Sequence, residues 1–97
     1  MHAGVVNFRV QPGRMEEAVQ IYLGSIVPAM REQRGFRNVL VLTDHETGEG
    51  YTVGLWETEV DAEAFESSGN YQKQIAKLGG LLAEPPIRKI YEVSLQM

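Results

Sequence analysis

The junction between residues 53–56 and the acidic segment after them constrains the fold more than any other part of the chain. Residues 53–56 read Val-Gly-Leu-Trp, which is typical of a strand. Thr58 and Asp61 follow in a near capping-box arrangement, so a helix is expected to begin near Thr58. A strand that passes into a helix within two or three residues indicates a small domain of mixed α and β structure.

Length, charge and composition narrow the class of protein. The chain has 97 residues, which suits a single domain over residues 1–97 with a modest core. The absence of cysteine excludes disulfides and thiolate metal sites and fits a cytoplasmic location. A net charge of −4 with scattered basic residues argues against a nucleic-acid binder. No signal sequence is expected, and no apolar run approaches the ~20 residues that span a membrane.

The first third of the chain predicts a strand followed by a helix. Residues 5–10 alternate as a strand, and its apolar face carries Val6, Phe8 and Val10. A helix is expected to open at Arg14 and to end at Gly35. Pro28 cannot donate a backbone hydrogen bond, so a kink or break is expected there. Apolar residues at helical spacing predict one buried stripe, made of Met15, Ala18, Val19, Tyr22, Ile26 and Met30.

The remaining segments complete a β-α-β-β-α-β order. Residues 38–43 and 51–56 are predicted strands joined by a glycine-containing hairpin turn. Gly69-Asn70 is expected to interrupt the second helix, and Pro85-Pro86 to lead into a last strand over residues 87–95. This order predicts an α+β fold, the ferredoxin-like unit with a four-stranded antiparallel sheet.

One strand predicts that the chain assembles with a second copy of itself. Two helices can cover only one face of such a sheet, and the other face should alternate with polar residues if it met water. Residues 39–42 instead read Val-Leu-Val-Leu, which is apolar on both faces. We therefore expect a homodimer with its two sheets face to face. The alternative is that Leu40 and Leu42 are ordinary exposed apolar residues.

These features together resemble the antibiotic biosynthesis monooxygenase family. The resemblance covers nearly the whole chain, and it rests on packing and turn motifs: Leu55-Trp56, the helix with Ala62, Ala64 and Phe65, Ser68-Gly-Asn-Tyr71, Ile26-Val27-Pro28-Ala29, Gly35-Phe36, and the prolines before a strand with Tyr91 and Val93. The resemblance implies a dimeric α+β barrel, so the second copy expected from the strand pattern is also a family property.

The resemblance further implies a chemistry and a set of pocket residues. Family monooxygenases use no metal, flavin or haem and act on quinols or polyketides, so we expect no cofactor and a small aromatic substrate. A pocket that favours a phenolate needs hydrogen-bond donors and an aromatic wall. The residues that could bind the substrate are Asn7, Tyr22, Arg37, Trp56 and Tyr71. Each also has a simple packing or surface explanation, and no catalytic residue is assigned.

Two departures from the family leave the activity open. Many members carry histidines at the positions of Phe65 and Asn70, and neither residue here can transfer a proton. The histidines present, His2 and His45, are expected in a flexible terminus and a hairpin loop. Haem degradation, which uses a helix histidine in this fold, is not expected. Three hypotheses remain: a cofactor-independent monooxygenase, a non-catalytic ligand-binding or stress-response protein, and a structural dimerisation domain.

Overall fold

The computed structural model describes the whole chain, Met1–Met97, as one sheet with a layer of helices. The elements in chain order are β1 (His2–Arg9), α1 (Met15–Ile21), the π-helical turn η1 (Tyr22–Ile26), α2 (Val27–Arg31), β2 (Phe36–Thr43), β3 (Glu49–Trp56), α3 (Glu59–Ser67), α4 (Asn70–Ala76), the 3₁₀ turn η2 (Gly79–Leu81) and β4 (Ile87–Glu92). None of the helices combines the length and the apolar character that crossing a membrane requires.

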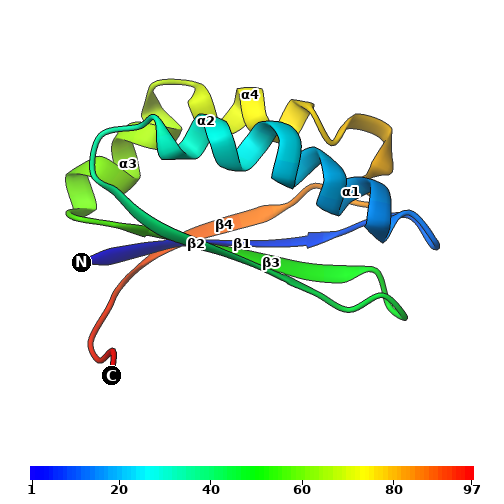
Figure 1. Cartoon of the computed structure of the whole chain (residues 1–97), viewed down its shortest axis with the longest axis horizontal. Coiled ribbons are helices and arrows are strands. Elements are labelled where there is room, and N and C mark those ends of the chain that lie inside the picture. The colour runs from blue at the N-terminus through cyan, green and yellow to red at the C-terminus, as the bar shows by residue number, and fades with distance from the viewer.

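The four strands form one antiparallel sheet in the order β2-β3-β1-β4. Helices connect β1 to β2 and β3 to β4, and all of them lie on the same side of the sheet (Figure 1). This arrangement is the ferredoxin-like unit, so the predicted α+β fold class is confirmed.

The N-terminal residues belong to the sheet. The sequence pattern predicts a strand from residue 5, but β1 begins at His2. Residues 2–4 pair with β3 on one side and with β4 on the other, which holds them in the extended conformation. His2 lies opposite Trp56 and Glu92 in these ladders. The expectation that His2 lies in a flexible terminus is therefore wrong.

The last strand is shorter than the sequence predicts. β4 ends at Glu92 and not at Leu95. Its partner strand is β1, whose first residue, His2, lies opposite Glu92. The final backbone bond of the pair runs from the Val93 N–H to the Met1 carbonyl, at 3.0 Å. Residues beyond Val93 alternate as a strand would, but they lie outside the register in which β1 and β4 pair.

The first helical stretch passes through Pro28 without breaking. Figure 1 shows a continuous ribbon from α1 to α2, where the sequence predicts a kink or a break. The Val27 N–H donates to the Tyr22 carbonyl, five residues back, which makes η1 a π-helical turn just before the proline. The hydrogen-bond pattern thus changes register just before Pro28, which has no N–H to donate, and the helix continues past it. Tyr22, Ile26 and Met30 stay buried on one face.

The second helical stretch begins and breaks where the sequence predicts. The Thr58 side chain accepts a hydrogen bond from the Asp61 N–H at 3.1 Å and caps α3. Gly69 has a φ of +86°, which side chains other than glycine rarely adopt, and it separates α3 from α4. The break redirects α4, which begins at Asn70, over the sheet.

The core lies between the helices and the sheet and is centred on Trp56. This side chain has no exposed surface, and its ring lies 5.3 Å from the Phe65 ring and 5.8 Å from the Phe36 ring. The stripe predicted on the first helix faces the same core, with Val19 alone half-buried and its other members buried. The predicted strand face of Val6 and Phe8 is buried as well.

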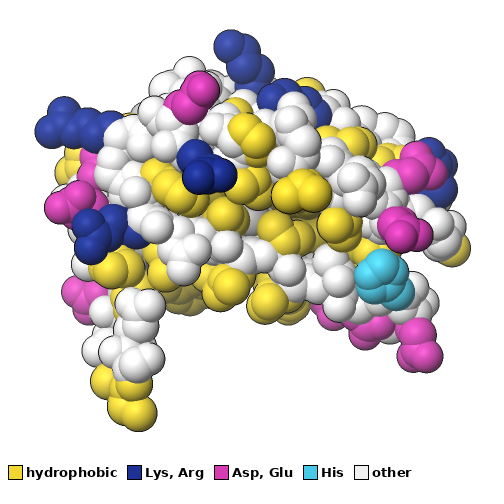
Figure 2. Space-filling model, in the orientation of Figure 1, with side chains coloured by type: hydrophobic (Ala, Val, Ile, Leu, Met, Phe, Trp, Pro, Cys, Tyr) yellow, Lys and Arg dark blue, Asp and Glu magenta, His cyan; other side chains and the backbone are white.

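The opposite face of the sheet has no covering element within the chain. Leu40 and Leu42 on this face are 51% and 49% exposed, whereas Val39 and Val41 pack against the core. The strand is therefore apolar on both faces, as predicted. The register places further apolar residues on the open face: Val5, Tyr51, Val53, Leu55, Ile87 and Tyr91. Figure 2 shows apolar side chains along the lower edge of the sheet and on the C-terminal tail.

Glycines on the helix-facing side of β3 leave room for large rings. A Cβ on Gly50 would overlap the Phe8 ring and lie 2.9 Å from the Leu42 carbonyl oxygen. A Cβ on Gly54 would lie 3.2 Å from the Trp56 Nε1. These glycines therefore set how closely the core rings approach the sheet.

We predict that Gly50→Ala lowers the free energy of unfolding by about 1–3 kcal/mol, because a backbone carbonyl and a buried ring cannot both move away from the new methyl group. The matched control is Gly24→Ala, in a helical position where an added Cβ would meet no atom within 4 Å, which should leave stability equal or raise it by up to ~1 kcal/mol. Urea denaturation measures both variants. Equal midpoints for Gly50→Ala and the wild type would contradict the packing described above.

Candidate functional site

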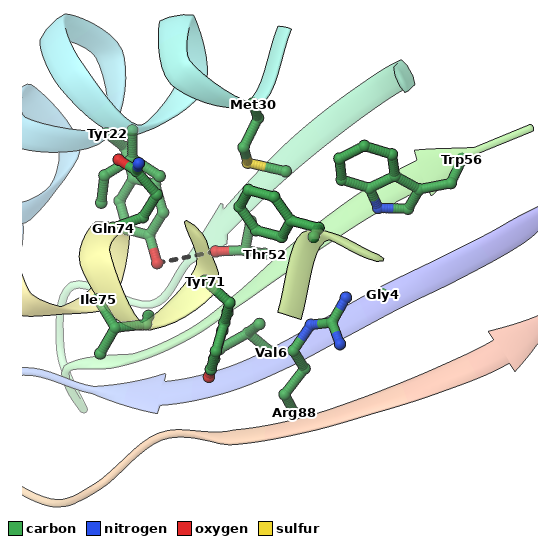
Figure 3. Close-up of a pocket in the computed structure, with 12 residues that line it drawn as sticks. Gly4, Val6, Tyr22, Met30, Thr52, Trp56, Tyr71, Gln74, Ile75 and Arg88 are labelled. Atoms are coloured by element: carbon green, nitrogen blue, oxygen red, sulfur yellow. Dashed lines mark hydrogen bonds between the residues drawn. The ribbon is translucent and has the colours of Figure 1, made fainter. Parts of the chain in front are cut away.

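A small, partly open cavity lies between the helices and the sheet (Figure 3). It lies beneath η1, α2, α3 and α4 and above β1, β3 and β4. Its walls are mostly apolar and aromatic, and polar groups reach it from Tyr22, Thr52, Gln74 and Arg88. The space open to the centre of a water molecule is about 30 Å³. That is enough for about two waters and too little for an aromatic ring without side-chain movement.

Tyr22 and Thr52 form a buried hydroxyl pair at one side of the cavity. Thr52 Oγ1 donates to the Tyr22 hydroxyl at 2.9 Å, as Figure 3 shows. Burial raises the pKa of Tyr22 to about 12, and the hydrogen bond from Thr52 opposes this only in part. Tyr22 is therefore a neutral phenol at physiological pH, able to donate its own proton to a ligand.

Two buried polar atoms at the cavity have no hydrogen-bond partner in the protein. They are the Trp56 indole Nε1 and the Gln74 side-chain oxygen. Buried polar groups are nearly always paired with protein atoms or water, so an unpaired donor and an unpaired acceptor beside one cavity need an explanation. A bound polar molecule would supply it.

Arg88 places a buried positive charge at the cavity. Its side chain is only 5% exposed. Its Nη1 donates to the Glu66 carboxylate, and its Nη2 donates to the Ala62 carbonyl at 2.9 Å, both on α3. A guanidinium has five N–H groups, so these two bonds leave others free to donate to a ligand. Figure 3 shows the guanidinium pointing from β4 into the space between the sheet and the helices.

The position of Arg88 depends on Gly4. A Cβ at residue 4 would lie 2.9 Å from the Arg88 Nη2. Gly4 also pairs opposite Gly54 in the β1–β3 ladder. Two facing glycines thus form a floor of bare backbone, with the guanidinium over one of them and the Trp56 indole over the other.

Tyr71, on α4, packs on the guanidinium. The Arg88 Cζ lies 5.3 Å from the centre of the Tyr71 ring, a cation–π geometry. Burial raises the pKa of the Tyr71 hydroxyl, while the nearby Arg88 charge lowers it. Tyr71 is therefore a second neutral phenol, and its ring helps to hold the buried charge in place.

The structure brings three of the five sequence-predicted residues together. Tyr22, Trp56 and Tyr71 all line the cavity. Asn7 lies on the open face of the sheet, where its Nδ2 is 3.3 Å from the Glu49 carboxylate. Arg37 lies at the start of β2, with an exposed side chain 4.0 Å from Glu57. Neither Asn7 nor Arg37 reaches the cavity.

Three polar residues of the cavity were not predicted from the sequence, namely Thr52, Gln74 and Arg88. A signal for Arg88 exists, because strand alternation places it on the same face as Ile90, which packs against the core. An arginine on the core-facing side of a strand is unusual and indicates a functional role. No comparable signal marks Gln74, on the helix after the Gly69 break.

The positions at which family members carry histidine lie beside the cavity. The Phe65 ring lines it, and Asn70 lies at the adjacent surface, where its Nδ2 donates to the Gln33 side chain at 3.2 Å. His2 and His45 do not line the cavity. No group of three or more His, Cys, Asp or Glu side chains is placed to hold a metal ion.

The sequence matches a protein-family model described as antibiotic biosynthesis monooxygenase, over residues 1–77. The match thus covers the chain from β1 through α4 and stops before β4, which carries Arg88. A comparison with curated proteins found no match.

Solved structures share the fold along nearly their whole length. A candidate antibiotic biosynthesis monooxygenase from Bordetella bronchiseptica is 23% identical, with a TM-score of 0.80 and 97% of each chain covered. The monooxygenase from the gene ActVA-Orf6 of Streptomyces coelicolor, solved with the ligand nanaomycin D, is 22% identical, with a TM-score of 0.73 and coverage of 99% of this chain and 89% of that one. Rv0793 from Mycobacterium tuberculosis is 18% identical, with a TM-score of 0.73 and coverage of 98% and 96%. At these identities the likeness shows the fold alone.

We predict that Tyr22 makes stability depend on pH between about 10 and 12. The folded state keeps the phenol protonated to a pKa of about 12, whereas the unfolded chain ionises it near 10, so its contribution is complete below pH 10 and is lost as the pH rises towards 12. The loss over this interval should approach ~2–3 kcal/mol.

Urea denaturation of the wild type and of Tyr22→Phe at pH 8 and pH 11.5 measures this loss. The phenylalanine variant cannot ionise, so the wild type should lose more stability than the variant over this interval. A stability difference between the two proteins that stays constant with pH would contradict the assignment.

Proposed function

Because the chain belongs to the antibiotic biosynthesis monooxygenase family, we propose that it is a monooxygenase that oxidises a small aromatic or quinol-like substrate with dioxygen and without a bound cofactor. The observation that carries the proposal is the cavity, where an aromatic wall meets the buried Arg88 guanidinium and two unpartnered polar atoms. The finer parts, the substrate class and the absence of a cofactor, rest on this chemistry and on the family resemblance.

The proposed reaction needs no reductant other than the substrate. An ionised phenol or enol transfers one electron to dioxygen, and the resulting radical and superoxide combine to form a carbon–oxygen bond. The peroxide formed in this way takes up a proton to become a hydroperoxide, and its oxygen–oxygen bond then breaks. One oxygen atom remains on carbon as a carbonyl, and the other leaves as water with the two hydrogens lost from the substrate. The protein must therefore stabilise an anion and keep it out of bulk water.

Arg88 suits this task. A buried cation attracts an oxyanion far more strongly than an exposed one, because little water screens the pair. Its partner Glu66 is about half exposed, so the Arg88 charge is only partly neutralised inside the protein. The Trp56 N–H and the protonated hydroxyls of Tyr22 and Tyr71 add neutral donors around the cavity. All these groups favour the anionic form of a substrate oxygen.

The cavity contains no general base. No histidine or carboxylate lines it, and Tyr22 and Tyr71 hold their protons more tightly than free tyrosine. The substrate must therefore lose its proton because of its own acidity, assisted by the field of Arg88. Hydroquinones and anthrones, whose anions are electron-rich, meet this requirement better than simple alcohols or alkanes.

A second function is binding without turnover. The two residues at the family's histidine positions, Phe65 and Asn70, cannot transfer a proton, and the cavity lacks a replacement for them. A protein that only captures a phenol or carboxylate next to Arg88 would need nothing more than the groups present. Oxygen consumption distinguishes the two functions.

We further propose that two copies of the chain pair through the open sheet face. Eight apolar side chains lie on this face without cover, and Leu40 and Leu42 are about half exposed. Exposed apolar patches of this kind mark association surfaces in soluble proteins. A second identical sheet offers the same apolar surface and is the partner that the family resemblance implies.

We predict oxygen uptake with a panel of hydroquinones and anthrones, above the rate without protein, and one atom of ¹⁸O from ¹⁸O₂ in each product molecule. Arg88→Met should lower kcat/KM by about 10²–10³-fold, because it removes the charge that stabilises the anion. Arg31→Met, on the exposed end of α2, is the matched control and should leave the rate unchanged. Uptake no greater than the protein-free rate across the panel would leave binding as the function.

We predict that Leu40→Glu combined with Leu42→Glu converts a dimer into a folded monomer at micromolar concentration, since four charges would face each other across the paired sheets. Light scattering measures the mass, and circular dichroism verifies the fold. Val60→Glu places a charge on an exposed position of α3, in the helix layer, and should leave the mass unchanged. A wild-type protein that is monomeric at this concentration would refute the pairing.

A further inference from the structure

Two hollows meet at a single side chain, Phe65. One is the cavity of about 30 Å³ described above. The other is a groove of about 160 Å³ at the surface, between the end of α2 and the junction of α3 with α4. Phe65 lines both hollows, and no other residue does. Its side chain is thus a partition between the inside of the protein and the groove.

The sizes of the two hollows give this partition a function. A closed cavity of about 150 Å³ is needed to hold a benzene-sized molecule, several times the space beside Arg88. The groove by itself has a volume of about 160 Å³, which is enough for such a molecule. Movement of the Phe65 ring would join the two and make room for a substrate ring against Trp56, whose indole lies 5.3 Å from Phe65.

The groove has polar walls that hold the helix junction together. The Asn70 Nδ2 donates to the Gln33 Oε1 at 3.2 Å and to the Ser68 Oγ at 2.9 Å. Ser68 in turn donates to the Phe65 carbonyl at 3.4 Å. These bonds connect the end of α2 to the backbone that carries the partition. Gly69 follows directly, with a φ of +86° and no atom within 4 Å of the position that a Cβ would take.

We propose that Phe65 is the gate and the size-determining residue of the ligand site. A one-ring phenol or quinol reaches the cavity through the groove, displaces the Phe65 ring and occupies the space between Trp56 and Arg88. The amides of Gln33 and Asn70 then face the polar substituents that remain in the groove. This inference rests on the proposed function for the class of ligand, while the route through the groove rests on the geometry alone.

The route can be tested without turnover, because Trp56 is the single tryptophan of the chain. Acrylamide quenching of its fluorescence reports access to the cavity. Phe65→Ala should raise the quenching constant by a factor of about three or more, since it removes the partition. Phe65→Leu retains more core volume and should show a smaller increase if the alanine variant fails to fold.

A second substitution locates the path. Ala64 is exposed on α3 and lines the groove but not the cavity, so Ala64→Leu should fill the groove and reverse the increase caused by Phe65→Leu. Ala76→Leu places the same side chain at an exposed α4 position outside both hollows and should reverse nothing. The proposed route would be overturned if Ala64→Leu and Ala76→Leu had equal effects, or if no Phe65 variant changed the quenching constant.

Calorimetric titration with phenol and with 1-naphthol tests the role of Phe65 in size selection. The wild type should prefer phenol, and Phe65→Leu should shift the ratio of affinities towards 1-naphthol by about tenfold, because the pocket gains the volume of several atoms. An unchanged ratio would overturn size selection by Phe65. If quenching responds as described but no oxygen uptake is seen, the proposed reaction is refuted and the gate stands. If oxygen uptake is seen but quenching does not respond to the Phe65 variants, the gate is refuted and the reaction stands.

Discussion

The packing of Trp56 against bare backbone is the constraint from which the rest of the structure follows. A Cβ on Gly54 would lie 3.2 Å from the Trp56 Nε1, so the bare backbone there lets the indole pack close to β3, within reach of Phe65 on α3 and Phe36 on β2. The helix layer is thereby held at a fixed height above the sheet. Gly4, opposite Gly54, extends the bare floor and leaves the space that Arg88 fills from β4. The packing of the core and the space of the cavity thus both depend on the facing glycines Gly4 and Gly54.

A core built for stability alone would not contain these polar groups. The buried Arg88 guanidinium carries a desolvation cost that Glu66, half exposed, offsets only in part. The unpaired Trp56 N–H and Gln74 oxygen each add the cost of a lost hydrogen bond. Features that oppose local stability are expected at functional sites, where a ligand supplies the missing partners. These three groups lie at one cavity, which favours that cavity as the ligand site.

Much of the fold could be predicted because its signals are local. The cap at Thr58, the break at Gly69 and the alternation in residues 38–43 each act through neighbouring residues. The end of β4 could not be predicted, since it depends on where β1 begins. The site was predicted only in part. Tyr22 and Trp56 belong to apolar patterns that must face the core. Asn7 is next to Val6 in the same strand, so its side chain lies on the opposite face and points away from the core.

The ionisable groups around the cavity limit what the site can do to a substrate. Two phenols that keep their protons and one guanidinium can stabilise an anion, but they cannot create one from a weakly acidic molecule. The two proposed functions, ligand capture and oxygenation, would therefore begin from the same bound anion. They differ in whether dioxygen can reach that anion and whether water is kept away from the superoxide that forms. In the proposed site both conditions would depend on Phe65, because its side chain lines both the cavity beside Arg88 and the groove.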